Sequence, residues 1–371
     1  MKILCVHQGA ELYGSDRSFA LSVETLRDKY PEATLVVIIP NEGELIPYLE
    51  PFVNEIIIQD VGAIQRSDFK LPFSTLIRLC KSSYLAWKRI KHFDVVYMNT
   101  IVVFAFMIAS IFSTKTIIHH IREIPSKTES YIFSLLFRLN KSFLIFNSQY
   151  TKNSFSFLKQ GSNNVVLNGV QAFESEEKIK NQSTFNILLI GRINAWKGQT
   201  LAIKAIELLA SKYPQIRLRI VGSAAEGQEF YVENMLTCIK QLELSKYIEY
   251  VSFQNDPKEH FYWSTISVVP STKPEPFGRV AIESLALGRP VIASNHGGLI
   301  EIIKADIGGY LFNAGDENDL AIKISLLIDD EELLRKKSVE AKDCFEKNFS
   351  EKVYKKNFNF TFNQILKNNN L

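Results

Sequence analysis

The feature that most constrains the fold is an alternation of short apolar segments with longer amphipathic ones, which occurs twice along the chain. In the first half, apolar runs occupy residues 3–6, 35–39, 55–58, 95–98, 116–119, 143–146 and 165–167. In the second half they occupy residues 185–190, 217–221, 248–253, 266–269, 291–293 and 310–312. Apolar strands separated by helices are typical of parallel sheets that are covered on both faces. The sequence therefore predicts an α/β chain with two doubly wound, Rossmann-like domains.

The length of 371 residues also favours two domains, because single cores stop growing near ~250–300 residues. Residues 171–184 are mostly polar and lack periodicity, so they are interpreted as a linker between a domain of residues 1–170 and a domain of residues 185–346. Residues 347–371 carry Tyr354, Phe358 and Phe362 at a spacing of four, which predicts a C-terminal helix that packs back toward the N-terminal domain. Ligands are expected at the carboxyl ends of the strands, where the two domains face a cleft.

Composition excludes several classes of protein. A hydrophobic content of 46% with 12% aromatic residues is too high for a disordered chain, and a net charge of +3 argues against a dedicated nucleic-acid binder. The first apolar run ends at His7, which argues against a secretory signal. The cysteines have no metal-ligand spacing, so a reduced, cytoplasmic protein without a metal site is expected. They are Cys5, Cys80, Cys238 and Cys344.

One segment, residues 95–112, is apolar enough to suggest a membrane span. Asn99 and Thr100 divide it, and the uninterrupted part is only 12 residues long, whereas a span needs about 20. We therefore predict a strand followed by a buried helix that starts near Thr100.

Two polar clusters follow predicted strands in the first half. Residues 7–17 include Gly14, Ser15 and Asp16; the glycine allows close approach of a ligand, and either polar residue can cap the next helix. An ordinary strand-to-helix turn explains this segment equally well, and the absence of a GxGxxG fingerprint argues against a dinucleotide cofactor. Residues 119–123 carry His119, His120, Arg122 and Glu123, which could handle a proton or an anion. Core or solvated histidines are the alternative, and adjacent strand residues point to opposite faces, which argues against a metal pair.

Two further clusters lie in the second half. Arg192 and Lys197 are five residues apart on a loop that opens a helix, where they can bind two phosphates or simply be solvated cations. In residues 273–283, flanking prolines hold Glu275 in an extended loop and Gly278 begins a helix with free N–H groups. Glu283 follows about one and a half turns later. Two carboxylates around a phosphate-binding helix end suit a nucleotide sugar, although a capped helix with a solvated glutamate explains each residue singly.

Taken together, the chain resembles the retaining GT-B glycosyltransferases of family GT4, the glycosyl transferases group 1. The matching segments occur in family order over essentially the whole length. They are the loop 9–17, residues 120–123, 146–148, 168–170, Gly191-Arg192 with Lys197-Gly198, Val221-Gly222, Glu275-Pro276-Phe277-Gly278 with Glu283, residues 288–293, and Gly297-Gly298 with Glu301.

The resemblance implies a role for each matching residue. Arg192 and Lys197 neutralise the donor diphosphate, Glu275 holds the hydroxyls of the donor sugar, and Glu283 binds the ribose. The same donor site includes Phe277, Gly278, Arg279 and Val280. The catalytic group comprises His120, near the reacting sugar, with Arg192, Lys197 and Glu275. The loop residues Gly14, Ser15, Asp16 and Arg17, together with Arg122, adjoin the diphosphate and the acceptor.

The implied activity is transfer of a sugar from a nucleoside-diphosphate sugar, a UDP-sugar in the first instance, to an acceptor hydroxyl with retention of anomeric configuration. The resemblance implies no cofactor and no metal, and it suggests work on a bacterial surface polysaccharide or glycoconjugate with a glycan, lipid-linked or protein acceptor. The alternatives are another GT-B enzyme, such as a nucleotide-sugar epimerase, and a non-catalytic GT-B partner subunit.

Charge is uneven in the first half of the chain. Residues 1–69 carry 5 Lys/Arg against 11 Asp/Glu, whereas residues 70–159 carry 13 against 3, which is a net charge of +10. Within the basic block, residues 75–92 combine Leu76, Leu79, Leu85 and Trp87 with five basic side chains. This segment is interpreted either as a peripheral contact with an anionic membrane surface or as a core helix with a solvated basic face.

Overall fold

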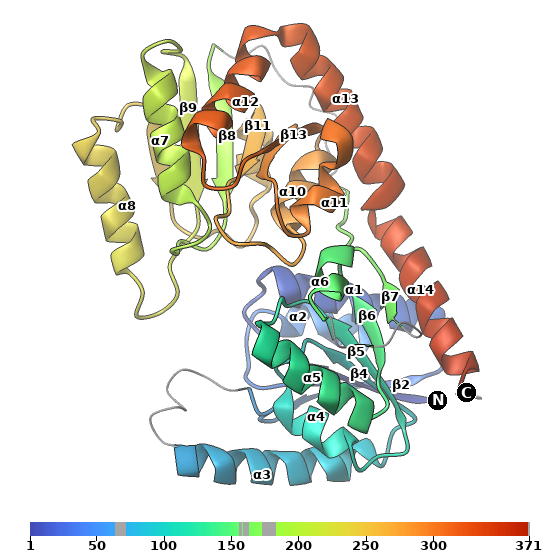
Figure 1. Ribbon diagram of the computed structural model, residues 1–371. Coiled ribbons are helices and arrows are strands. Elements are labelled where there is room, and N and C mark those ends of the chain that lie inside the picture. The colour runs from blue at the N-terminus through green and yellow to red at the C-terminus, as the bar shows by residue number, and fades with distance from the viewer. Residues whose placement is uncertain (64–71, 156–157, 159–162, 173–182, 370–371) are drawn as a thin grey trace. The chain divides into compact units, whose positions relative to one another are not determined.

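The computed structural model describes residues 1–63, 72–155, 158, 163–172 and 183–369 (Figure 1). The chain divides into two compact units. The N-terminal unit comprises Met1–Asn168 with Tyr354–Leu371, and the C-terminal unit comprises Gly169–Val353. Most of the predicted linker, residues 171–184, lies outside the described residues.

The N-terminal unit is built on a seven-stranded parallel sheet with the order β3-β2-β1-β4-β5-β6-β7. Its strands are β1 (Lys2–His7), β2 (Thr34–Ile39), β3 (Glu55–Ile58), β4 (Val95–Asn99), β5 (Thr116–Ile121), β6 (Phe143–Phe146) and β7 (Asn163–Val165). The chain leaves β1 toward β2 and β3, then returns to the other side of β1 to form β4, so the topological switch point lies between β1 and β4. The last strand begins and ends two residues before the predicted range 165–167.

Helices cover both faces of this sheet. They are α1 (Gly14–Lys29), α2 (Ile46–Leu49), α3 (Pro72–Ile90), α4 (Phe104–Ser110), α5 (Lys127–Leu139), α6 (Gln149–Asn153) and α14 (Glu351–Lys367). One core joins the sheet to α1 and α14, and the cores on the opposite face join it to α3, α4 and α5. In α14, Tyr354, Phe358 and Phe362 lie fully inside the first core, which places the aromatic stripe against the N-terminal sheet.

The helix predicted to start near Thr100 begins at Phe104. Thr100 has a φ of 134°, which a helix does not allow, so a short loop separates β4 from α4. Within the described residues, no helix combines the length and the apolar character needed to cross a bilayer.

The C-terminal unit repeats the architecture with a six-stranded parallel sheet of order β10-β9-β8-β11-β12-β13. Its strands are β8 (Phe185–Ile190), β9 (Ile216–Val221), β10 (Ile248–Val251), β11 (Ile266–Val269), β12 (Val291–Ser294) and β13 (Gly309–Phe312). Its helices are α7 (Gln199–Ala210), α8 (Phe230–Gln241), α9 (Lys258–Trp263), α10 (Arg279–Ala286), α11 (Leu299–Ile302), α12 (Glu317–Asp329) and α13 (Glu331–Asn348). Strand β10 ends two residues before the predicted position 253.

The main core of this unit joins the sheet to α7, α8 and α12, and a smaller core on the other face includes Phe261 of α9 and Val280 of α10. The switch point of the C-terminal unit lies between β8 and β11. The prediction of two doubly wound parallel sheets is confirmed.

Candidate functional site

In the C-terminal unit, the loops that follow β8 and β11 meet at the switch point. Gly198, which precedes α7, has a φ of +79°, and a Cβ atom built there would lie 1.8 Å from the carbonyl oxygen of Pro270. The backbone N–H of Thr272 donates to the carbonyl of Trp196 at 2.7 Å. Only glycine allows this close approach, so the two loops are held together at the edge where Rossmann-like folds bind ligands.

Lys197 and Glu275, which lie on these two loops, form an ion pair. The distance from Lys197 Nζ to Glu275 Oε1 is 2.8 Å, and the Ser271 hydroxyl donates to the same oxygen. The Glu275 side chain is 7% exposed and that of Lys197 is 20% exposed. Burial alone would raise the pKa of Glu275, but the charge and hydrogen bond of Lys197, with Ser271, hold it below its ordinary value. Glu275 is therefore a charged, buried acceptor at neutral pH.

A glycine pair after β12 supports the backbone of Glu275. The N–H of Gly298 donates to the carbonyl of Glu275 at 2.8 Å, and a Cβ atom at Gly297 would lie 2.5 Å from that same oxygen. The preceding residue, His296, is the last of the groups that lower the pKa of Glu275, after Lys197 and Ser271. Neither ring nitrogen of His296 is accessible to solvent or has a partner among the described residues. Sequence reasoning missed His296 and Ser271.

The helix α10 begins at the same place. Gly278, with a φ of +110°, is its N-cap residue, and Phe277 is buried with an edge contact to Phe349. Within the helix, Arg279 Nε donates to Glu283 Oε1 at 2.7 Å. Val280 is partly buried against the smaller core. The first turn of α10 therefore presents its backbone N–H groups beside the Lys197–Glu275 pair, with Glu283 held by an arginine one turn away.

Arg192 lies in the loop after β8, with an exposed side chain and a backbone carbonyl that accepts a hydrogen bond from Gln199 Nε2 at 3.1 Å. It shares the loop of Lys197, as predicted from the spacing. The predicted donor residues thus all belong to the C-terminal unit and gather on the loops after β8 and β11 and on α10.

In the N-terminal unit, the predicted residues also lie at the switch point. His7, Asn99 and His120 are register partners on β1, β4 and β5, so their side chains lie on one face at the carboxyl ends of three neighbouring strands. His7 Nε2 lies 2.6 Å from Asp16 Oδ1, and the other oxygen of Asp16 accepts a hydrogen bond from the N–H of Tyr13 at 2.7 Å.

Asp16 takes part in the capping box of α1, as one of the two predicted capping residues, but neither Ser15 nor Asp16 is the N-cap residue. The helix begins at Gly14 with Tyr13 as N-cap, so Ser15 and Asp16 lie inside its first turn rather than before it. Asp16 instead accepts from the preceding backbone, and its carboxylate fills the space beside Gly9, where a Cβ atom would be 2.7 Å from Oδ1. In the same loop, Arg17 Nε donates to the carbonyl of Leu12 at 3.1 Å.

Arg122 is the centre of a buried polar network at the end of β5. Its Nε donates to Asn99 Oδ1 at 2.7 Å, its Nη1 donates to Asn168, and its Nη2 lies 3.3 Å from His120 Nδ1. Glu123 accepts a hydrogen bond from the Thr100 hydroxyl, and burial raises the pKa of its carboxyl. Both histidines are fully buried: His119 packs against Phe137 on one face, and His120 against the opposite core. Their opposite directions agree with the expectation that they form no metal pair.

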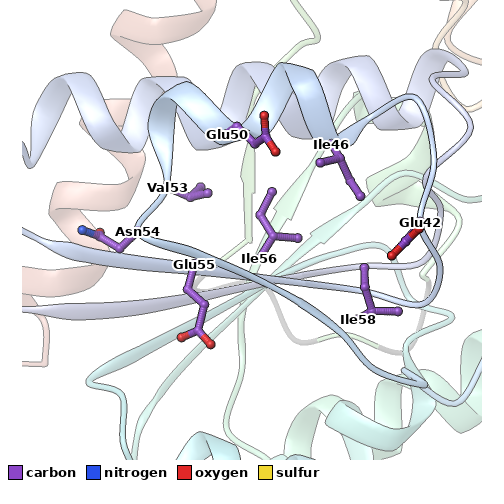
Figure 2. A pocket seen from close by; sticks show the side chains of 8 residues that line it. All are labelled: Glu42, Ile46, Glu50, Val53, Asn54, Glu55, Ile56 and Ile58. Atoms are coloured by element: carbon purple, nitrogen blue, oxygen red, sulfur yellow. The ribbon is translucent and has the colours of Figure 1, made fainter.

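Two cavities among the described residues do not coincide with these clusters of polar side chains. One of about 410 Å³ lies along the edge strand β3, where Figure 2 shows Glu42, Glu50 and Glu55 around apolar side chains. Another of about 380 Å³ lies between the 193–201 loop and α8. Neither is lined by a residue predicted for the site, although Gly198, which follows Lys197, lines the second. Among the described residues, no group of three or more His, Cys, Asp or Glu side chains has the arrangement of a metal site.

Comparison with known proteins gives matches to both sequence and fold. Residues 170–343 match the family model described as glycosyl transferases group 1. An uncharacterized glycosyltransferase of Methanocaldococcus jannaschii is 31% identical over 215 residues, which are 57% of this chain and 56% of that protein. A capsular polysaccharide biosynthesis glycosyltransferase of Staphylococcus aureus, CapM, is 28% identical over 58% of this chain and 57% of that protein. The matches span about half the length of these curated relatives.

Solved structures match nearly the whole chain at low identity. HepE of Anabaena, solved in complex with UDP and glucose, has a TM-score of 0.82 at 23% identity, covering 98% of this chain and 99% of that one. Sucrose-phosphate synthase of Thermosynechococcus elongatus has a TM-score of 0.79 at 16% identity, covering 99% of each chain. These likenesses show the GT-B fold, and residues 170–343 of the chain are similar to the glycosyl transferases group 1.

Proposed function

We propose that the protein transfers a sugar from a UDP-sugar to an acceptor hydroxyl, with retention of anomeric configuration and without a divalent metal. The observation that carries the proposal is the Lys197–Glu275 pair at the switch point of the C-terminal unit, beside the N-terminus of α10. In this proposal Lys197 supplies a cation for a diphosphate, Glu275 supplies a carboxylate for sugar hydroxyls, and the first turn of α10 follows Glu275 in the chain. The similar fold of HepE, which was solved with UDP and glucose, supports this choice of donor.

In this proposal Lys197, Glu275 and Glu283 each have a distinct contact with the donor. An ammonium group has three N–H donors, and Glu275 takes one from Lys197, so the others can bind phosphate oxygens. Both the Lys197 and Ser271 contacts fall on Oε1 of Glu275. Neither of these two contacts uses the other carboxylate oxygen, Oε2. That oxygen is therefore suited to accept hydrogen bonds from sugar hydroxyls. Arg279 orients Glu283, and the resemblance assigns Glu283 to the ribose.

The proposed step breaks the bond between the anomeric carbon and the β-phosphate oxygen and forms a bond to the acceptor oxygen. The proton of the acceptor hydroxyl passes to the leaving phosphate, so the products are a glycoside and UDP. Negative charge grows on the departing diphosphate, where Lys197, Arg192 and the N-terminus of α10 stabilise it more than in the ground state. In this scheme the cations take the place of a divalent ion.

Turnover of a nucleotide-sugar panel, followed as nucleoside-diphosphate release with and without EDTA, tests the proposal. Lys197→Ala is expected to lower kcat/KM by at least ~100-fold, the usual scale for loss of one transition-state contact. Lys204→Ala is the matched control, because the pair of Lys204 with Glu317 is exposed and lies at 3.6 Å on α7 and α12. Full activity of Lys197→Ala would refute the site, and loss of activity with EDTA would refute the metal-free scheme. NMR of the product's anomeric proton decides between retention and inversion.

We infer that the acceptor belongs to a bacterial surface polysaccharide or glycoconjugate. The relationship to CapM, which is named for capsular polysaccharide biosynthesis, supports this class of acceptor. We expect UDP to be released only when a lipid-linked or free glycan acceptor is present. Interconversion of the donor sugar without any acceptor would favour an epimerase instead, and donor binding without turnover would favour a non-catalytic subunit.

We further propose that α3 binds an anionic membrane surface. Ala86 and Ile90 bury one side of this helix in the core, with Leu79 and Trp87 partly packed there, while other apolar side chains of the helix are exposed. Phe73, Leu76 and Ile77 are 75%, 57% and 55% exposed, next to the basic residues of the +10 segment. Exposed apolar side chains beside lysines and arginines are typical of helices that lie in a bilayer interface.

Co-sedimentation with vesicles of anionic and of neutral lipid tests this contact. The wild-type chain is expected to bind anionic vesicles and to dissociate in high salt, whereas Leu76→Ser with Ile77→Ser is expected to lose binding. Ile322→Ser serves as the control, since Ile322 is equally exposed, at 56%, on α12 of the other unit. Binding that does not depend on lipid charge or on these two residues would refute the proposal.

A further inference from the structure

His120 is the one predicted catalytic residue whose side chain is buried without access to solvent, and its contacts define its protonation. The Tyr97 hydroxyl lies 2.7 Å from His120 Nδ1, and Arg122 Nη2 lies 3.3 Å from the same atom. A guanidinium group can only donate hydrogen bonds. Its approach is unfavourable to an N–H at that position and favourable to a lone pair, so Nδ1 is the acceptor in both contacts.

The remaining nitrogen then carries the proton. In a neutral imidazole one ring nitrogen is protonated, so an accepting Nδ1 leaves the hydrogen on Nε2. His120 Nε2 is buried and has no partner among the described residues. A buried donor without an acceptor costs about 1–3 kcal/mol, and such a cost is tolerated where function uses the group.

The charged form of His120 is strongly disfavoured. Burial, and then the positive charge of Arg122, hold the pKa of His120 well below its ordinary value. The titratable groups that face it are Arg122, which directly follows β5, Tyr97 on β4 and Tyr354 on α14, and Phe358 of α14 stacks on its ring. Burial raises the pKa of both tyrosines, so they stay neutral donors at physiological pH.

The network reaches the C-terminal helix through one serine. The Ser22 hydroxyl of α1 lies 3.1 Å from the Tyr97 oxygen and 2.7 Å from the Tyr354 oxygen. Because Tyr97 gives its single proton to His120, Ser22 donates to the Tyr97 oxygen and accepts from the Tyr354 hydroxyl in this network. The α14 helix therefore supplies a hydroxyl and the stacked ring of Phe358 to the surroundings of a β5 residue more than 200 positions earlier in the chain.

We propose that Tyr97 and Arg122 fix His120 as a neutral imidazole with its proton on Nε2. During sugar transfer it then donates a hydrogen bond from Nε2, and it neither takes up a second proton nor gives up the one it has. Tyr97 and, through Ser22, Tyr354 are positioning residues for this tautomer. The functional half of this inference rests on the proposed transferase activity, whereas the tautomer itself does not.

The direct test is ¹⁵N NMR of the histidine side chains in the full-length chain, which needs no substrate. The six histidines are assigned from single histidine variants. His120 is expected to show a protonated Nε2 and an unprotonated Nδ1 that do not change between pH 5 and 8. A proton on Nδ1, or titration within that range, would overturn the proposal whether or not the protein is a glycosyltransferase.

Tyr97→Phe tests positioning, since it removes one oxygen and keeps the ring. Loss of a donor to Nδ1 is expected to mix the tautomers and to move the titration of His120 to higher pH. If the transferase activity holds, kcat should fall by about 10-fold, the scale of one hydrogen bond, while KM for the donor stays within about twofold. Tyr354→Phe should change the His120 signals in the same direction by less.

Tyr30→Phe is the matched control, because the Tyr30 hydroxyl also joins α1 to α14, through Asn363, but lies outside the network. It is expected to leave the His120 signals and the pH profile unchanged. If Tyr97→Phe and Tyr30→Phe behave alike, the tyrosines contribute only to stability and the positioning role is refuted.

Discussion

Replacing Lys197 with methionine should destabilise the C-terminal unit, independently of any effect on catalysis. Methionine keeps most of the apolar stem of the side chain and removes the charge. The carboxylate of Glu275 then stays in a site where only 7% of the side chain is exposed, with Ser271 as its remaining side-chain donor. The variant therefore leaves a buried charge without its counter-ion.

The size of the effect follows from this burial. Removing one partner of a buried ion pair costs about 3–5 kcal/mol, because the other charge stays desolvated. Lys197 is one-fifth exposed, so water partly compensates, and we expect about 2–3 kcal/mol. For a unit of this size each kcal/mol lowers Tm by about 2–4 °C, which gives a fall of about 4–12 °C.

Thermal unfolding of Lys197→Met, Glu275→Gln, the double variant and Lys204→Met checks the magnitude. In Lys197→Met with Glu275→Gln no charge remains unpaired, so the double variant should be more stable than Lys197→Met alone, with a coupling of about 1–3 kcal/mol. Lys204→Met removes an exposed cation 3.6 Å from Glu317 and should change the unfolding free energy by no more than about 1 kcal/mol. A Tm for Lys197→Met within the range of Lys204→Met would contradict the argument, as would a double variant less stable than both singles.

The pH dependence gives a second readout with a definite sign. The pKa of Glu275 in the folded protein lies below its ordinary value of 4.5, so the pair stabilises the fold above that value and its contribution is lost as the pH falls through the folded pKa. Without Lys197 the largest remaining influence is burial, which raises the pKa. Lys197→Met should therefore regain stability on acidification from neutral pH toward pH 5, relative to wild type. A parallel loss in both proteins would refute this assignment.

Two further variants test the backbone and the N-terminal unit. Gly278→Ala places a Cβ atom 2.5 Å from Leu299 at a φ of +110°. This variant should lower the free energy of unfolding by about 1–3 kcal/mol and weaken donor binding. The control Gly227→Ala, at a φ of +74° with open space around it, should lower the free energy of unfolding by about 1–2 kcal/mol. Equal effects would refute a packing role for Gly278. Asp16→Asn replaces the acceptor 2.6 Å from His7 by an amide and should destabilise the chain by about 1–3 kcal/mol in urea unfolding, a result that an unchanged midpoint would contradict.

The sheets could be predicted from the sequence because buried parallel strands need continuous apolar residues, and those runs recur at the spacing of a strand and a helix. The ends of elements were less predictable. At β10 the aromatic Phe253 extends the apolar pattern, but the strand ends at Val251 since pairing with β9 stops there. At Thr100 a positive φ delays the helix to Phe104, and no residue type in that loop signals such a backbone.

The predicted amphipathic segment of residues 75–92 shows a related limit. Leu79 and Trp87 pack against the core, whereas Leu76 and Leu85 on the same helix are exposed. Periodicity identifies a helix with an apolar stripe, but it does not say which apolar residues face the sheet when they surround more than half of the helix.

Position relative to the switch points explains why the sequence indicates candidate residues in both units. In each sheet, the two strands whose connections diverge leave their carboxyl ends uncovered by a crossover helix, so polar residues directly after them are candidates for function. In one unit His7 and Asn99 are the last residues of these strands, although Asn99 was not predicted as a site residue, and in the other Lys197 and Glu275 lie on the loops that follow them. What the rule does not give is which polar residues pair. Lys197 and Glu275 are 78 residues apart, and Tyr97 meets His120 and Tyr354 only because β4, β5 and α14 share one core. Such pairings depend on register and on helix docking, and they decide whether a carboxylate is charged and on which nitrogen an imidazole holds its proton.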